Sequence, residues 1–186
     1  MSAGLDHGAP DAPEIAATRT WLERAVIGLN LCPFAKSVYV KRQVRFVLTD
    51  AVTTDALHDV LEAELRLLHA TPAEQIDTTL IVHPHVLQDF LDYNDFLDEA
   101  DALIESLELD GEIQVASFHP DYQFAGTDYD DAGNCTNRTP HPTLHLLREA
   151  SIDRAVAVYP DPDVIVERNL ETMEKLGFTG YAKLLE

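Results

Sequence analysis

Basic residues are scarce in this chain of 186 residues, which has 13 lysines and arginines against 33 aspartates and glutamates and a formal net charge of −20 at pH 7. Such an acidic surface repels phosphate backbones and anionic lipids, so the composition argues against a nucleic-acid partner and against a membrane partner. Lysine is the rarer cation and occurs only at positions 36, 41, 175 and 183. Each basic side chain is therefore worth examining as a candidate for binding an anion.

Cysteines and long apolar runs are also few. The two cysteines, Cys32 and Cys135, have no zinc-ribbon or CxxC spacing, and a cytoplasmic protein would keep them reduced. No apolar run approaches the roughly 20 residues that a membrane-spanning helix needs. Residues 1–12 lack the basic start and apolar core of a signal peptide. We therefore expect a short disordered leader and a cytoplasmic protein.

The apolar residues are patterned as in a globular protein, and they make up 46% of the chain. We predict a single α/β domain over residues 13–186, with four strands at 44–49, 78–83, 113–118 and 154–159. Amphipathic patterns predict helices at 13–31, at 86–107, at 163–176, from Thr53 or Thr54 (either can be the cap) to Ala70, and a short one at 142–150. This alternation predicts a mainly parallel sheet with helices on both faces, although the direction of the fourth strand stays open.

Two of the predicted strands end in the same way, on His83-Pro84 and on His119-Pro120. Each proline stops its strand and holds the histidine before it in an extended backbone. Ligands of parallel sheets bind outside the carboxyl ends of the strands, so we expect both imidazoles to border one pocket with Tyr122 nearby. The structural alternative is that each histidine only satisfies local hydrogen bonds.

A polar loop and a predicted helix follow in "GNCTNRTPHPTLHLLRE", residues 133–149. Asn137 and Arg138 offer amide and guanidinium donors, and a helix N-terminus favours anions. His145 and Arg148 are three residues apart and would share a helix face. An arginine in so acidic a chain favours a carboxylate or phosphate ligand. Turn chemistry before a surface helix is the alternative, and Arg168 either faces the site or pairs with a neighbouring glutamate.

Cys32 lies in "GLNLCPFAK", residues 28–36, where the first helix is expected to end. If Pro33 opens a new helix, Cys32 is its N-cap, and the helix dipole favours a thiolate that could act as a nucleophile. If Cys32 closes the first helix, the dipole acts in the opposite sense. A third interpretation is a buried small hydrophobic residue.

Several long motifs resemble one family: "TRTWLERAVIGLNLCPFAK", "LDYNDFLDEAD", "ASFHPDYQFAGT", "TNRTPHPTLHLLREAS" and "ERN". The chain is similar over about residues 13–178 to a bacterial and plant family catalogued as domain-of-unknown-function family 1415. The resemblance implies that a set of residues is typical of the family, namely Cys32, His119, Asn137, Arg138, His145, Arg148, Arg168 and Asn169. His141 and Cys135 depart from its pattern, which argues against a redox pair of Cys32 and Cys135. No catalytic role follows from the resemblance.

These patterns together predict a small-molecule enzyme that acts on an anionic metabolite. His83 and His119 would be its acid/base groups, because histidine transfers protons near neutral pH, and Cys32 is a candidate nucleophile. The predicted substrate-binding residues are Asn137, Arg138, His145, Arg148, Arg168 and Tyr122.

Two other functions stay open. One is a metabolite-binding module without turnover. The other is a metal-dependent enzyme that uses His83, His119 and His145, or Cys32 in place of one of them. The sequence identifies no cofactor, no reaction type and no oligomeric state, and it lacks the close ligand pair that usually marks zinc.

Overall fold

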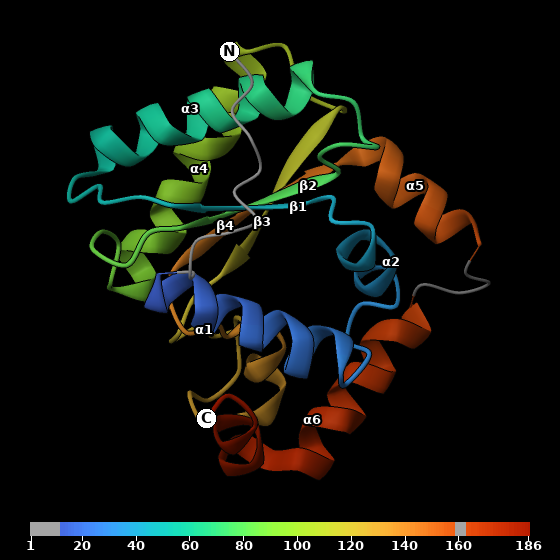
Figure 1. Cartoon of the computed structure of the whole chain (residues 1–186). Helices are drawn as coiled ribbons and strands as arrows, with labels where there is room; N and C mark the ends of the chain where they lie inside the picture. The colour runs from blue at the N-terminus through green and yellow to red at the C-terminus, as the bar shows by residue number, and fades with distance from the viewer. Residues whose placement is uncertain (1–11, 159–162) are drawn as a thin grey trace.

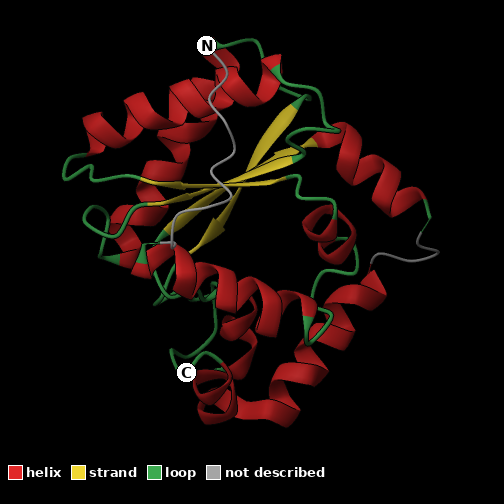
Figure 2. Cartoon of the chain, in the orientation of Figure 1, coloured by secondary structure: helices red, strands yellow, loops and turns green. Residues whose placement is uncertain are grey.

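A mixed four-stranded sheet forms the centre of the molecule. The computed structural model describes residues 12–158 and 163–186, so the predicted leader lies outside it apart from Ala12. The strands, in sheet order, are β1 (Val44–Leu48), β2 (Thr78–Val82), β4 (Thr143–Arg148) and β3 (Ile113–Phe118). Figure 2 shows the sheet enclosed by helices.

The strand β4 lies between β2 and β3 and is antiparallel to both, whereas β1 and β2 are parallel. The strands β1, β2 and β3 therefore all run in one direction, as predicted. The prediction of a mainly parallel sheet is wrong, because β4 runs in the opposite direction between two of them. The predicted helix at 142–150 is wrong as well. Leu144 and Leu146 of this segment are both fully buried on one sheet face, which is the alternation of a strand. Hydrogen bonds to β2 and β3 on its two edges stabilise the segment as a strand.

The fourth strand predicted at 154–159 is the other error. Residues Glu149–Ala157 form helix α5, and Tyr159 lies outside the described residues. A run of valine and alanine predicts a strand when a sheet interior can bury it. No residue of α5 is buried, and β4 takes the inner place of the sheet beside β2.

The other four predicted helices are present with shifted ends, and the described part of the chain contains two further short helices. They are α1 (Pro13–Trp21), its π-helical continuation η1 (Leu22–Ile27), α2 (Ala35–Val40), α3 (Thr54–Ala70), α4 (Phe90–Ser106), the 3-10 helix η2 (Ala132–Asn137) and α6 (Asp163–Leu184). Thr53 caps α3 by accepting a hydrogen bond from the Ala56 N–H at 3.2 Å. Gly177, where the last helix was predicted to end, is non-helical with a φ of 69°, so α6 consists of two helical segments that meet at a kink there.

Helices cover both faces of the sheet, with α3 and α4 on one face and α1, α2 and α6 on the other (Figure 1). The first face holds a core of leucines from α3 and aromatic residues from α4 against Ile81. The buried stripe of α4 runs through Tyr93 and Phe96, whereas Leu91 is 71% exposed. Among the described residues, no helix has the length and apolar character needed to cross a membrane.

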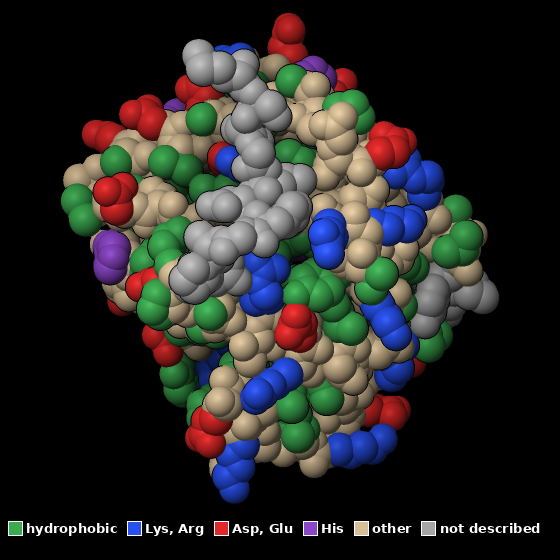
Figure 3. All heavy atoms as spheres, in the orientation of Figure 1, with side chains coloured by type: hydrophobic (Ala, Val, Ile, Leu, Met, Phe, Trp, Pro, Cys, Tyr) green, Lys and Arg blue, Asp and Glu red, His purple; other side chains and the backbone are tan. Residues whose placement is uncertain are grey.

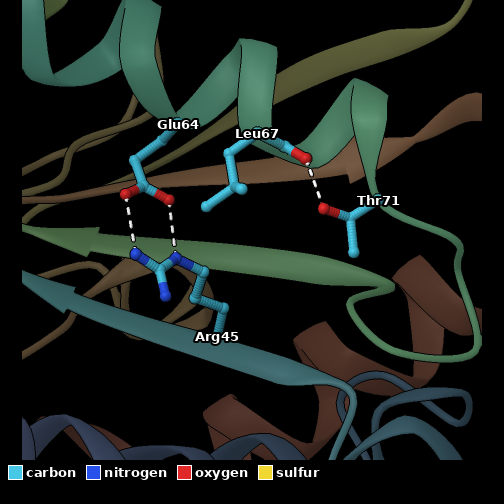
Figure 4. Close-up of polar contacts among 4 residues, drawn as sticks. All are labelled: Arg45, Glu64, Leu67 and Thr71. Carbon is cyan, nitrogen blue, oxygen red and sulfur yellow. Dashed lines mark hydrogen bonds and ion pairs between the residues drawn. The ribbon is translucent and has the colours of Figure 1, made fainter. Parts of the chain in front are cut away.

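Charged contacts attach α3 to the sheet. Arg45 of β1 donates from Nε and Nη2 to the two carboxylate oxygens of Glu64, at 2.7 and 3.0 Å (Figure 4). Glu64 is buried, and this pairing raises the pKa of Arg45. At the end of α3, the hydroxyl of Thr71 donates to the Leu67 carbonyl at 2.7 Å (Figure 4).

Arg148, at the end of β4, holds the same helix terminus. Its guanidinium donates to the Leu68 carbonyl at 2.6 Å, to the Ile76 carbonyl at 3.0 Å, and to the carbonyl of Thr71. The last carbonyls of a helix have no intrahelical donor and carry partial negative charge, so a cation there stabilises the helix. Arg148 thus binds backbone in the structure, where the sequence predicted an anionic metabolite.

We predict that Arg148→Met lowers the free energy of unfolding by about 2–4 kcal/mol, because several half-buried carbonyls lose a charged donor. Urea unfolding measures the effect. The matched control is Arg66→Met, which removes an exposed ion pair with Glu62 on the same helix and should cost at most about 1 kcal/mol. Equal losses in the two variants would contradict the assigned role of Arg148.

Candidate functional site

A cavity of about 980 Å³ lies between the sheet and the helices of the second face. Its volume is in the range of about 300–1,000 Å³ that is typical of small-molecule pockets. The sheet forms the floor with Leu80, Ala116, Phe118 and Leu147, and the wall includes Trp21 of α1 and residues of α2, α5 and α6. Most of the lining is apolar, so a ligand with an apolar body fits it best.

His145 is the titratable imidazole in this floor. It stands on β4 opposite Leu80 and Ala116 of the neighbouring strands. Its Nε2 lies 2.6 Å from the hydroxyl oxygen of Thr78, which is itself 2.6 Å from the Leu146 carbonyl oxygen. Two oxygens this close need a proton between them, so Thr78 donates to Leu146 and accepts from His145. The proton of His145 is therefore on Nε2.

The other ring nitrogen of His145 is available to a ligand. Nδ1 makes no hydrogen bond to any described residue, and it is accessible from the cavity instead of being sealed in the protein. Burial lowers the pKa of His145 from 6.5 to about 4, which keeps the ring neutral at pH 7. His145 thus presents a lone pair to the cavity and can accept a hydrogen bond or a proton.

Cys32 and Asn137 also line the cavity. Cys32 is half-buried and lies between η1 and α2; Phe34, and not Cys32, is the cap of α2. Asn137 donates from Nδ2 to the Ser117 carbonyl at 3.1 Å and so fixes the end of β3. Cys135 is a separate free thiol in the core, where burial raises its pKa.

Asn169 of α6 is a lining residue that the sequence analysis did not include among the site residues. Its Nδ2 donates to the Leu31 carbonyl at 2.8 Å, and its buried Oδ1 has no partner among the described residues. Its agreement with the family motif "ERN" was the signal that could have identified it. Thr78 was also missed, because a threonine at the start of an apolar strand gives no sign that it binds a histidine.

His83 and His119 lie on the opposite face of the sheet. Both are fully buried and pack against Tyr93, with ring centroids 5.8 Å and 5.1 Å from the Tyr93 ring. They are therefore close together, as predicted, but neither lines the cavity that contains Cys32.

Both rings hold the loop between β2 and α4. His83 donates from Nδ1 to the Val86 carbonyl at 3.1 Å. His119 donates from Nε2 to the Leu87 carbonyl at 3.1 Å and accepts from the Asp121 N–H at 3.0 Å. Leu87 has a φ of 57°, a strained conformation for a leucine. The geometry corresponds to the structural alternative for the two strand-end histidines.

Three other predicted site residues bind backbone or pack. Arg138 is 3% exposed and donates to the carbonyls of Tyr122 at 3.0 Å and Tyr129 at 2.6 Å, so it folds the polar loop after β3 around itself. Arg168 donates to the Asn30 carbonyl at 2.5 Å. The Tyr122 ring packs against the Phe90 ring, with the two ring centroids 5.1 Å apart.

The predicted site is thus divided. Cys32, Asn137 and His145 share the cavity, and the other predicted residues do not line it: His83, His119, Tyr122, Arg138, Arg148 and Arg168. The histidines of the metal alternative lie on opposite faces, and no group of three potential metal ligands occurs in residues 12–158 and 163–186.

The buried histidines predict a loss of stability in acid. Burial lowers the pKa of His83 to about 4, so the unfolded chain binds more protons than the folded one between pH 6.5 and about 4. The contribution of the neutral His83 ring to the free energy of unfolding is fully present above pH 6.5. It is lost as the pH falls to about 4, by up to about 1.4 kcal/mol per pH unit.

Urea unfolding across this pH range tests the prediction. The free energy of unfolding of His83→Asn should fall less steeply with decreasing pH than that of the parent chain. His85→Asn changes an exposed histidine two residues away and should keep the parent slope. Parallel curves for the parent chain and His83→Asn would contradict the prediction.

One comparison with known proteins gives a match. No curated protein and no solved structure matches the chain. The model of the family described as "Protein of unknown function (DUF1415)" matches residues 14–183, nearly the whole chain. The long motifs that predicted this family are thus confirmed, and the chain belongs to the DUF1415 family.

Proposed function

We propose that the protein is a small-molecule enzyme whose substrate, an anionic metabolite, occupies the cavity and whose acid/base group is His145. The observation that carries the proposal is the accessible Nδ1 lone pair of a neutral imidazole in the floor of a pocket-sized cavity. Cys32 on the wall is the candidate nucleophile. The proposal includes a cytoplasmic location, which the two free thiols support.

An anionic substrate would solve a chemical problem of this site. A base whose pKa is about 4 accepts protons poorly at pH 7. A negative charge in the cavity favours the imidazolium form and raises this pKa, since opposite charges within a few ångströms stabilise each other in a low dielectric. Binding of the substrate would therefore activate the base.

A metabolite-binding module without turnover is the second candidate, and one observation favours it. The Nε2–H of His145 donates to a threonine hydroxyl, whereas many catalytic histidines have a carboxylate in this position, which stabilises the imidazolium. In such a module, His145 would accept a hydrogen bond from the ligand and nothing more.

The variant His145→Gln separates the two candidates, because glutamine can accept a hydrogen bond but is no base at neutral pH. Metabolites that raise the melting temperature of the parent chain are first selected and then tested for chemical change. For an enzyme, we expect turnover in the variant to fall by about 10²- to 10⁴-fold, with binding weakened at most about tenfold. His85→Gln is the matched control and should behave as the parent chain does. A set of stabilising metabolites of which the parent chain converts none would contradict the enzyme proposal.

The bond from His145 to Thr78 predicts a second variant effect. Thr78→Val removes the acceptor of the Nε2–H, so the ring loses its preference for this tautomer and a buried N–H is left unpaired, at a cost of about 1–3 kcal/mol. Nitrogen chemical shifts of the imidazole report the tautomer directly. The parent chain should show Nε2–H alone, and Thr78→Val should show a mixture. A parent chain with its proton on Nδ1 would contradict the assignment.

A further inference from the structure

The cavity has two chemically different ends. Its apolar end contains Trp21 and Phe118, whose ring centroids are 5.2 Å apart. The lining of the other end includes six polar residues: Lys41, Gln43, Glu74, Asp77, Ser151 and Arg154. We refer to these six residues as the polar end. It lies at the first residues of β1 and β2, between α2 and α5 (Figure 1).

Hydrogen bonds connect the polar end into one structure. The side-chain amide of Gln43 donates to the Glu74 carbonyl at 3.1 Å, and the Asp77 N–H donates to the Gln43 carbonyl at 2.9 Å. The Ser151 hydroxyl donates to the Asp77 carboxylate at 2.6 Å and accepts from Arg154 at 2.9 Å. These contacts hold α5 and the loop between α3 and β2 around one opening of the cavity.

Cations are unusually frequent there. Lys41 and Arg154 line the polar end, and Arg148 lies close enough behind it to interact with the charges of Glu74 and Asp77. Two cations and two acids thus line the polar end, in a chain whose acids outnumber its bases 33 to 13. On the face drawn in Figure 3, basic side chains lie over α2 and α5 and also over α1 and α6.

The two lining cations are available to a ligand. Lys41 and Arg154 are exposed to solvent, and neither forms an ion pair with a carboxylate in the described part of the chain. The Asp77 carboxylate, in contrast, is already engaged by the Ser151 hydroxyl. An anionic group at this opening would therefore meet unpaired positive charge.

We propose that the cavity binds an amphipathic carboxylate, with its head group between Lys41 and Arg154 and its apolar body along β4 toward Phe118. This inference rests on the proposed function and names the substrate class. The five residue steps of β4 span about 17 Å, and His145 lies about 10 Å from Arg148 along the strand. A ligand anchored at the polar end thus passes the Nδ1 atom of His145 before it reaches Trp21.

Trp21 provides the readout, because it is the single tryptophan of the chain and lines the cavity. Three probes that each carry a twelve-carbon chain are titrated below their micellar concentrations or, for the alcohol, below its solubility: dodecanoate, dodecanol and dodecyltrimethylammonium. We expect dodecanoate to change the Trp21 fluorescence saturably and to bind at least tenfold more tightly than the cation. Shorter carboxylates should lose about fourfold in affinity for each methylene removed.

The double variant Lys41→Ala/Arg154→Ala tests the position of the head group. Dodecanoate should bind about tenfold more weakly, because two partly exposed charge contacts are lost, and dodecanol should bind as before. Lys175→Ala/Arg66→Ala is the matched control: it removes two exposed cations that belong to helix-surface ion pairs, changes the net charge equally and should not affect either probe.

Three results would overturn the inference: no preference for dodecanoate over the cation, unchanged dodecanoate binding in the Lys41/Arg154 variant, or undiminished binding when Ala116→Leu fills the floor beside His145. The proposed function fails separately. Dodecanoate needs no proton transfer, so its binding should persist in His145→Gln, whereas conversion of a true substrate should not.

Discussion

The antiparallel insertion of β4 between β2 and β3 is the constraint on which the rest of the structure depends. β4 is one of the two inner strands, with a hydrogen-bonded ladder on each edge. Its alternate residues serve both faces: Leu144 and Leu146 fill the core under α3 and α4, and His145 and Leu147 form the floor of the cavity. The residue that ends it, Arg148, holds the C-terminus of α3. A shift of β4 by one residue would exchange the two faces and destroy the core and the cavity together.

Much of this fold could be predicted from the sequence, and the exceptions have a physical reason. The strands at Val44, Thr78 and Ile113 and the cap at Thr53 follow from local patterns, since each segment shows its own periodicity. The segment of β4 does not, because its strand character comes from partners that are distant in the chain. Its threonine and histidine, preceded by Pro142, fit a loop followed by a helix equally well. Tertiary pairing decides between the two, and one sequence does not show it.

The site was predictable to a similar degree. Sequence reasoning identified Cys32, Asn137 and His145, which lie together in the cavity, but it could not assign roles. His83 and His145 have similarly lowered pKa values for the same reason, burial, yet one ring holds a loop and the other faces open space. The sequence does not distinguish an arginine that binds backbone carbonyls from one that binds a ligand carboxylate, because a guanidinium can donate to either. Arg138 and Arg148 both donate to backbone carbonyls.

The position of β4 also explains where the cavity lies. In an open parallel sheet, the crevice for a ligand lies at the carboxyl ends of strands that separate at a switch point. Here that edge, between His83 and His119, is occupied by the start of β4: the His83 N–H donates to the Pro142 carbonyl at 3.1 Å, and Tyr93 donates to the Thr143 carbonyl at 2.8 Å. The cavity lies instead on one face of the sheet, and its polar end is at the amino ends of β1 and β2. His145, in the middle of β4, therefore lines this space, whereas the two histidines at the strand ends do not.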